Sequence, residues 1–358
     1  MVTSKFILLL VIQLFCIEYS EQSWTDGLKK IFKSFDFDDF EDDVDEVSAF
    51  SSSTGGVNNE PVIGILTQDY LDHFKDYYKT KSHFPSMYSK WVEAAGGRVV
   101  PIHVNRDEQY YKDLLPQLNG VLLPGGKQDI SNCSFTTASQ IIFNYAIEAK
   151  KRGEIFPVWG TCQGFEVLVY LIAGYDPLTL TKAVDMPAPI VFEKEFKNYK
   201  TLVKGTRLFK SLDKRTYNAM KTTESTIHYH NFGLTKQNFT KIHSLKNFFR
   251  IISSNPDENG LENISIIEGK EYPFYATIFH PEVAQFSFVN RPAHERIPHN
   301  KEAIQTAQYF ANFFVNECKK NLNGLREETK KSLLHHYNPE DTDQPHLVND
   351  QVYFFPLK

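Results

Sequence analysis

The chain has 358 residues, a length at which one large α/β domain or two modest ones can form. Its 29 Phe and 18 Tyr supply ample material for a buried core, and its net charge is −5, with acidic and basic residues interleaved over most of the length. A nucleic-acid-binding protein would normally carry a basic stripe, so the charge pattern argues against that class of partner.

The first 20 residues have the features of a signal peptide. Lys5 precedes an apolar run at residues 6–16, which is too short to span a bilayer because spanning takes about 20 apolar residues. Ser20 is a small residue near a suitable cleavage point. We expect residues 1–20 to be removed on export, although a buried strand or an uncleaved anchor would fit the same run. No later segment reaches transmembrane length, so no stable membrane insertion is expected.

Sequons and cysteines agree with a lumenal or extracellular route. Three Asn-x-Ser/Thr sequons begin at Asn132, Asn238 and Asn263, and each is a candidate glycosylation site. Beyond the signal segment the cysteines are Cys133, Cys162 and Cys318. An odd number of cysteines in an oxidising compartment leaves at least one thiol free, which points to chemistry at a thiol. A pairing of Cys133 with Cys318 stays open.

The composition divides the remaining chain into three parts. Residues 21–60 contain an acidic run at 36–46 followed by a Ser/Gly cluster, a composition typical of solvated, mobile chain. We expect the folded domain to occupy residues 61–322. Residues 323–358 are polar and are expected to form a peripheral tail, in which 353–355 can dock locally.

From residue 61 onward, short apolar segments alternate with helical patterns. Strands are predicted at 62–66, 99–102, 120–123 and 156–159, and helices at 83–95, 138–151 and 162–172. Further strands are predicted at 248–253, 264–267 and 275–279, and an amphipathic helix at 301–320. This alternation indicates βαβ units, hence a mostly parallel sheet with right-handed crossovers that place helices on both faces.

A Gly-x-Cys-x-Gly sequence lies where the fourth predicted strand meets a helix. Gly160, Cys162 and Gly164 form it, and it is the pattern of a nucleophile elbow, a sharp turn that lifts the nucleophile above the edge of the sheet. Glycines are needed because side chains there would collide with neighbouring backbone. The partial positive charge at the helix N-terminus favours a thiolate. The pattern predicts Cys162 as a nucleophile, with a buried structural cysteine in a plain turn as the alternative.

A base and an orienting carboxylate follow the strand at 275–279. His280 and Glu282 are two residues apart, and on an extended segment their side chains would lie on the same side. One imidazole nitrogen could then donate to the carboxylate while the other faces the thiol, which is the logic of a catalytic triad.

Backbone donors for an oxyanion are expected after the third predicted strand. The segment 122–126 ends in two glycines, so its N–H groups are open to a ligand. The N–H groups of Gly126 and Gln163 would form the oxyanion hole, although a plain turn would also explain the glycines.

Four segments occur in the order typical of one enzyme family: residues 61–66, 122–126, 157–166 and 279–282. Over about residues 61–320 the chain resembles the gamma-glutamyl hydrolases, peptidase family C26 within the class I glutamine amidotransferase-like superfamily. The resemblance implies a flavodoxin-like three-layer α/β sandwich with a mostly parallel central sheet. It implies an enzyme with Cys162 as nucleophile, His280 as base and then acid, and Glu282 as its orienting partner. No metal or other cofactor is expected, because no His/Cys cluster has ligand spacing.

The resemblance also implies further site residues and a substrate. It assigns His230 to the active site, with His228 close enough to leave the choice within the pair open, and it makes Tyr88, Gly125 and Glu166 substrate-binding residues. The implied reaction is hydrolysis of γ-glutamyl amide bonds in poly-γ-glutamyl folates. The implied setting is the lysosome or the extracellular space, and the implied assembly is a homodimer.

Two departures from the family and two other functions remain. The segments before residue 61 and after residue 324 lie outside the resemblance. Gln163 stands where relatives often carry Leu, which we expect to matter little because only its backbone would act. A glutaminase of the amidotransferase type and a non-catalytic γ-glutamyl-binding protein are the alternatives; activity towards glutamine would favour the first and an inert Cys162 the second.

Overall fold

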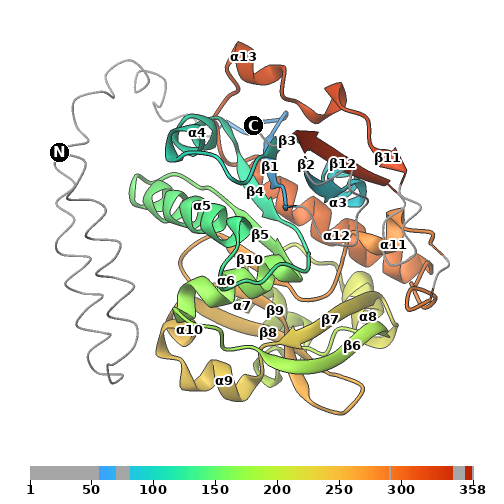
Figure 1. Ribbon diagram of the computed structural model, residues 1–358. Helices are drawn as coiled ribbons and strands as arrows, with labels where there is room; N and C mark the ends of the chain where they lie inside the picture. Colours follow the sequence, from blue (N-terminus) through green and yellow to red (C-terminus); the bar gives the residue numbers. More distant parts are fainter. Residues whose placement is uncertain (1–55, 70–80, 290–291, 342–350, 357–358) are drawn as a thin grey trace. The chain divides into compact units, whose positions relative to one another are not determined.

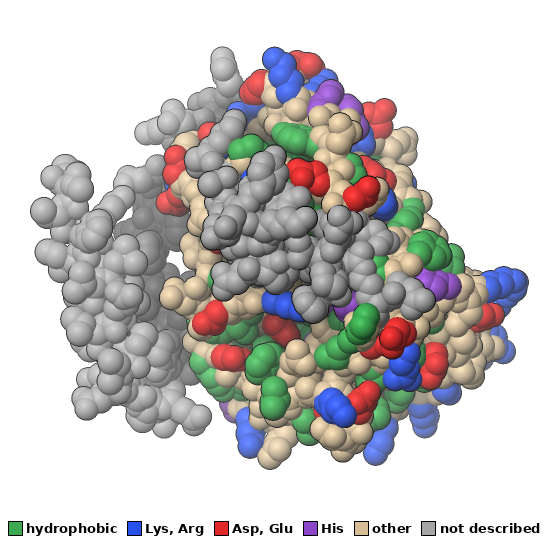
Figure 2. All heavy atoms as spheres, turned by 45° about the vertical axis from the view of Figure 1, so that its right-hand side comes forward, with side chains coloured by type: hydrophobic (Ala, Val, Ile, Leu, Met, Phe, Trp, Pro, Cys, Tyr) green, Lys and Arg blue, Asp and Glu red, His purple; other side chains and the backbone are tan. Residues whose placement is uncertain are grey.

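The computed structural model describes residues 56–69, 81–289, 292–341 and 351–356 (Figure 1). The predicted signal peptide and acidic run lie outside these residues. On the face drawn in Figure 2, acidic and basic side chains of the described residues are interspersed, as the sequence indicates. No helix in the described part of the chain is long and apolar enough to cross a membrane.

A seven-stranded sheet forms the centre of the fold, in the order β3-β1-β4-β5-β10-β9-β8. Its strands are β1 (Val62–Leu66), β3 (Arg98–Ile102), β4 (Gly120–Leu123), β5 (Val158–Thr161), β8 (Phe249–Pro256), β9 (Glu262–Gly269) and β10 (Phe274–Thr277). Neighbouring strands from β3 to β10 are parallel, whereas β9 pairs antiparallel with both β10 and β8. Numbered along the chain, the parallel strands have the order 2-1-3-4-5 of flavodoxin-like folds. The expected mostly parallel sheet is confirmed.

Helices cover both faces of this sheet because alternate strand residues point to opposite sides. In β1, Val62 and Leu66 join the core on one face, and Ile63 and Ile65 join the core on the other. The first face is covered by α4 (Glu108–Leu114), α5 (Ser134–Lys151), α6 (Gln163–Ala173), α9 (Lys236–Lys241) and α10 (His243–Phe248). The second is covered by α3 (Ser86–Glu93), α7 (Tyr199–Gly205), α8 (Lys214–Thr222) and α12 (Lys301–Cys318). The result is the three-layer sandwich that was expected.

A separate two-stranded sheet lies beside the central one and was not predicted. It consists of β6 (Thr179–Ala188) and β7 (Thr226–Gly233), which pair antiparallel with two irregularities of register. These irregularities interrupt the period-2 pattern by which a strand is recognised in sequence. The N–H of His280 donates to the carbonyl of Ile227 (2.9 Å), so β7 packs against the loop that carries His280.

The boundaries of two predicted helices differ from those observed. Helix α3 begins at Ser86 instead of residue 83, because the residue before Pro85 is biased towards extended backbone and residues Lys81–Pro85 form strand β2. Helix α5 begins at Ser134 instead of residue 138, where Cys133 caps it by accepting from the N–H of Thr136.

The segment at 323–358 is more than a peripheral tail. Strand β12 (Gln351–Pro356) pairs with β2 on one side and β11 (Glu340–Asp341) on the other. Val352 and Phe355 are completely buried, so β12 contributes to the core. From the sequence, residues 353–355 were expected to dock locally, but nothing in it indicated that they pair with β2, because that pairing joins segments far apart in the chain. Short elements complete the fold: α11 (Val283–Phe286), α13 (Glu327–Lys330), η5 (Leu115–Gln117), η6 (Lys194–Phe196) and η7 (Leu334–His336).

Candidate active site

Cys162 lies between β5 and α6 with a strained backbone. Its φ is 51° and its ψ −107°, a combination that non-glycine residues rarely adopt and that is typical of a nucleophile elbow. Its N–H donates to the carbonyl of Thr277 in β10 (2.8 Å), and the residue is 5% exposed. The fold therefore holds Cys162 at the carboxyl edge of the sheet, where doubly wound α/β proteins bind ligands.

The two glycines of the elbow are required by close packing. A Cβ added to Gly160 would lie 2.7 Å from the backbone of Gly164. A Cβ added to Gly164 would overlap the carbonyl oxygen of Leu123 in β4. Only glycine permits backbone segments to approach so closely. The same reason was given from the sequence for the glycines at these two positions.

His280 and Glu282 form a buried hydrogen-bonded pair. Nδ1 of His280 lies 2.7 Å from Oε1 of Glu282, and Glu282 is completely buried. The expectation that these residues lie on an extended segment is wrong, because Glu282 has helical backbone (φ −77°, ψ −16°) and caps α11. The turn after β10 still brings the two side chains together, as triad chemistry requires.

The other imidazole nitrogen of His280 is free to take part in chemistry. His280 Nε2 is buried and has no hydrogen-bond partner among the described residues. Burial by itself lowers the pKa of His280, but the negative charges of Glu282 and of a Cys162 thiolate outweigh it and raise the pKa to about 10. At neutral pH the imidazole is therefore protonated beside two acidic groups.

Tyr88 and Gly125 lie inside the site instead of at its surface. The N–H of Gly125 donates to Oη of Tyr88 (2.8 Å), which lies 3.5 Å from Nδ1 of His280. Tyr88 is 1% exposed, and burial together with the charges of Glu282 and Cys162 raises its pKa well above the usual value. The hydroxyl of Tyr88 accepts from the N–H of Gly125, and the carbonyl of Gly125 accepts from Gln68; that Tyr88 and Gly125 bind substrate stays a prediction.

The amides of Gly126 and Gln163 are the backbone donors available beside Cys162. Gln163 is the first residue of α6, where the N–H has no partner within the helix. Among the described residues, the Gly126 N–H makes no hydrogen bond. Their geometry is compatible with the oxyanion hole that the sequence predicts.

Sequence reasoning missed Gln68 and the side chain of Gln163. Gln68 Nε2 lies 3.0 Å from the carbonyl oxygen of Gly125 and 3.0 Å from Oε1 of Gln163. The position of Gln68 two residues beyond β1 could have drawn attention to it, because the carboxyl ends of parallel strands meet at one edge. The interaction with Gln163 had no signal in the sequence.

Glu166 lies in the first turn of α6 and is partly buried. Burial raises the pKa of Glu166 to about 8; the charge of Asp176 acts in the same direction, and His280 acts against both. The electrostatic effect of His280 indicates that Glu166 lies near the triad. As a largely neutral carboxylic acid at pH 7, Glu166 can donate as well as accept a hydrogen bond.

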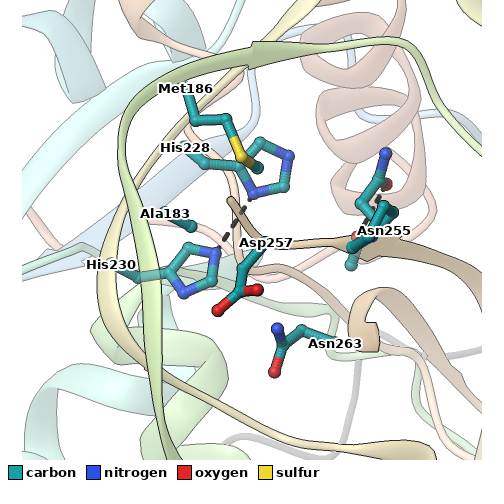
Figure 3. Close-up of a pocket in the computed structure, with 9 residues that line it drawn as sticks. Ala183, Met186, His228, His230, Asn255, Asp257 and Asn263 are labelled. Atoms are coloured by element: carbon teal, nitrogen blue, oxygen red, sulfur yellow. Dashed lines mark hydrogen bonds between the residues drawn. The ribbon is translucent and has the colours of Figure 1, made fainter. Parts of the chain in front are cut away.

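His228 and His230 line a narrow pocket beside the triad (Figure 3). Their rings point toward one another, with His228 Nδ1 3.2 Å from His230 Nε2, and His230 Nδ1 lies 2.8 Å from the carbonyl oxygen of Phe232. The other lining residues are Ala183, Met186, Asn255, Pro256, Asp257, Asn263 and Ser265. None of the lining residues belongs to the triad, and the hydrogen-bond partners of His230 are His228, Phe232 and Thr181.

Burial keeps both histidines of this pocket neutral. It lowers the pKa of His230 to about 4, against a hydrogen bond to Phe232 that raises it, and the charge of His280 lowers it further. Burial and the neighbouring His230 and His280 lower the pKa of His228 well below its usual value. Between pH 5 and 8 His230 is therefore neutral, and both of its ring nitrogens lie within hydrogen-bond distance of protein groups.

The three sequons differ in accessibility. Asn132 is exposed, as a glycosylated residue must be. Asn263 is 3% exposed in β9, and its amide donates to Leu261, so the structure contradicts glycosylation there. Asn238 is partly buried, and its amide donates to Pro177 and Thr179, which also disfavours a glycan.

The described cysteines are not paired with one another. Cys133, Cys162 and Cys318 are all free thiols, so Cys133 and Cys318 do not pair. Cys318 is buried beneath Gly120 of β4, which explains it as a core residue. The described part of the chain contains no group of three or more His, Cys, Asp or Glu side chains that could hold a metal ion.

Comparison with known proteins agrees with this geometry. The family model of Peptidase C26 matches residues 61–282. Gamma-glutamyl hydrolase B of Dictyostelium discoideum is 35% identical over 303 residues, covering 84% of each chain. The human gamma-glutamyl hydrolase is 34% identical over 287 residues, 80% of this chain and 86% of the human one. Gamma-glutamyl hydrolase 1 of Arabidopsis thaliana is 30% identical over 311 residues, 85% of each.

A solved glutamine amidotransferase of Thermotoga maritima covers 73% of this chain and 99% of its own, with a TM-score of 0.38 and 10% identity. At that TM-score the likeness carries no argument, and the fold class rests on the sheet order described above. The family match, by contrast, extends over most of the central sheet and includes the elbow and the His280–Glu282 pair. The chain therefore belongs to the peptidase C26 family of cysteine-type peptidases.

Proposed function

We propose that this protein hydrolyses γ-glutamyl amide bonds and that poly-γ-glutamyl folates are its substrates. The observation that carries the proposal is the strained Cys162 beside the buried His280–Glu282 pair at the carboxyl edge of the sheet. The relatives that are named gamma-glutamyl hydrolases support the bond type.

In the proposed mechanism the Cys162 thiolate attacks the γ-carbonyl carbon of a glutamyl residue. The oxyanion that forms is stabilised by the N–H groups of Gly126 and Gln163. Protonated His280 donates its Nε2 proton to the departing amine as the C–N bond breaks, and a thioester remains on Cys162. His280, now neutral, takes a proton from water, whose oxygen attacks the thioester and regenerates the thiolate. Glu282 holds the imidazole and stabilises its charged form throughout.

The remaining assignments belong to the same proposal. Glu166 would hydrogen-bond the substrate, and His230, which is neutral and electrostatically coupled to His280, would support the active site through its contact with His228. Residues 1–20 would direct the chain to the secretory route, and the protein would work as a homodimer in the lysosome or outside the cell. The exposed sequon at Asn132 is compatible with that route.

The proposal is tested by product analysis of the purified protein with pteroyl-pentaglutamate at acidic and neutral pH. We expect the wild type and a Cys133→Ala control to release glutamate or shorter γ-glutamyl chains, and Cys162→Ala to release none. Cys133 is the matched control because it is a second free thiol that is not fully buried. A wild type that hydrolyses only glutamine would indicate a glutaminase, and inertness towards both compounds would indicate a binding protein.

A further inference from the structure

Two buried glutamine side chains join the nucleophile elbow to the loop that follows β4. Gln68 and Gln163 are 2% and 1% exposed. Gln68 Nε2 donates to the carbonyl oxygen of Gly125 (3.0 Å) and to Oε1 of Gln163 (3.0 Å). Gln163 Nε2 in turn donates to the carbonyl oxygen of Gln128 (2.5 Å). The two amides thus form a continuous chain of hydrogen bonds from α6 to both ends of segment 125–128.

Gly126 is enclosed by these two amides. A Cβ added to Gly126 would overlap the terminal atoms of both Gln68 and Gln163, so the glycine backbone lies in direct contact with them. Oxyanion donors act only when they are held about 2.7–3.1 Å from the position that the oxyanion will occupy. The contacts that hold Gly126 against the elbow therefore set the distance between the two proposed oxyanion donors, the N–H groups of Gly126 and Gln163.

The glutamine pair is anchored at both of its ends. The backbone of Gln68 exchanges two hydrogen bonds with His83 of β2 (2.7 and 2.8 Å), and β2 is itself paired with β12. Gln163 is the first residue of α6, directly after the nucleophile. The pair thus connects two elements of the fold across the loop between β4 and α5.

We propose that the side chain of Gln163, acting with Gln68, is a positioning device that holds the oxyanion loop (residues 124–128) against the nucleophile elbow. The proposal rests on the function proposed above, because it concerns the same oxyanion hole. A leucine at position 163 would fill similar space but could neither accept from Gln68 nor donate to Gln128. This chain therefore fastens the loop with hydrogen bonds where a leucine would offer only packing.

The test compares Gln163→Leu with a matched control, Gln117→Leu. Gln117 is also a buried glutamine that donates to one backbone carbonyl, that of Asp113, and accepts from one backbone N–H, that of Arg326. It lies in η5, which precedes β4 and therefore sits at the opposite edge of the sheet from Cys162. Each variant loses one hydrogen bond donated to a backbone carbonyl and one accepted from an N–H group, which belongs to the Gln68 side chain in one case and to the Arg326 backbone in the other. Loss of stability alone would therefore affect them similarly.

Two measurements are made on the full-length protein. The first is kcat and KM with a γ-glutamyl substrate: we expect Gln163→Leu to lower kcat about 10- to 100-fold with KM changed less than about threefold, because the loop is displaced rather than removed. The second is hydrogen exchange of the amides in residues 125–128, which we expect to be faster in Gln163→Leu and unchanged in Gln117→Leu. Gln163→Glu, which keeps the acceptor and loses the donor, should also speed exchange.

The outcomes separate the two proposals. An active wild type with unchanged kcat and unchanged exchange in Gln163→Leu would overturn the positioning role and leave the proposed function standing. An equal loss of kcat in the Gln117 variant would reduce Gln163 to a structural role. If the wild type does not act on γ-glutamyl bonds, the proposed function fails, and exchange of residues 125–128 still decides whether the glutamines hold the loop.

Discussion

Replacing Gly125 by alanine should disable the site through a steric effect at its centre. The new Cβ would lie 2.7 Å from Tyr88 Oη, 2.8 Å from His280 Cε1 and 3.1 Å from Cys162 Cβ. Ordinary contact with a Cβ begins near 3.4 Å, so the imidazole would have to retreat by about 0.6 Å, and all three neighbours are buried with little space behind them.

The size of the effect follows from that displacement. A misplacement of about 1 Å in an active site can cost about 100-fold in rate, so we expect kcat/KM to fall about 10- to 100-fold in Gly125→Ala. Overpacking of a filled site costs about 1–3 kcal/mol in the free energy of unfolding, which a domain of this size can tolerate. The variant should therefore fold and remain largely inactive.

The assay measures kcat/KM on a γ-glutamyl substrate together with urea unfolding. Gly324→Ala is the control, since no atom lies within 4 Å of a Cβ at that position. Wild-type kcat/KM in a folded Gly125→Ala would refute the reasoning, because it would mean that the three side chains adjust without consequence. Loss of folding in Gly125→Ala would show that the cost of overpacking has been underestimated.

Three further predictions concern charge, glycosylation and the C-terminal strand. The raised pKa of His280 stabilises the folded state fully below pH 6.5, and this stabilisation is lost as pH rises through about 10. The free energy of unfolding of Glu282→Gln should therefore be lower than that of the wild type at low pH, and the difference should shrink over that range. Urea titrations at several pH values measure it, and a deficit independent of pH would contradict the assignment. In a eukaryotic secretory host, peptide mass spectrometry should find a glycan on Asn132 and none on Asn263; a glycan on Asn263 would mean that β9 is placed wrongly. Deleting residues 351–358 removes two fully buried side chains and should lower the free energy of unfolding by about 3 kcal/mol or more, as measured in urea; an unchanged value would show that β12 adds nothing to the core.

Much of the fold could be predicted from the sequence because the patterns that indicate it lie within short segments of the chain. The alternation of short apolar strands with helices predicts a parallel sheet, and the glycines around Cys162 predict a strained turn whatever the rest of the chain does. The pair His280 and Glu282 was also found correctly, although the backbone between them is a turn and not a strand. Side chains two residues apart can meet in either conformation, so the contact was predicted correctly although the backbone conformation was not.

Other features depend on segments that are far apart in the sequence. Tyr88, which was expected at the substrate, accepts a hydrogen bond from the N–H of Gly125, a contact that the sequence does not reveal. Tyr88 lies in α3, which directly follows β2, and β2 is paired with a strand more than 250 residues later. Gln163 was expected to act only through its backbone, and its side chain proved to be bonded to Gln68, which is 95 residues away in the chain.

By itself the sequence predicted which residues would carry the chemistry, because a nucleophile, a base and a glycine turn each need particular residue types in short, recognisable spacings. Only the tertiary structure decided how those residues are held: which amides are already occupied, which histidines are neutral, which sequons are buried and which distant strand supports the site. Such properties depend on burial and on long-range hydrogen bonds, and neither leaves a periodic signal along the chain.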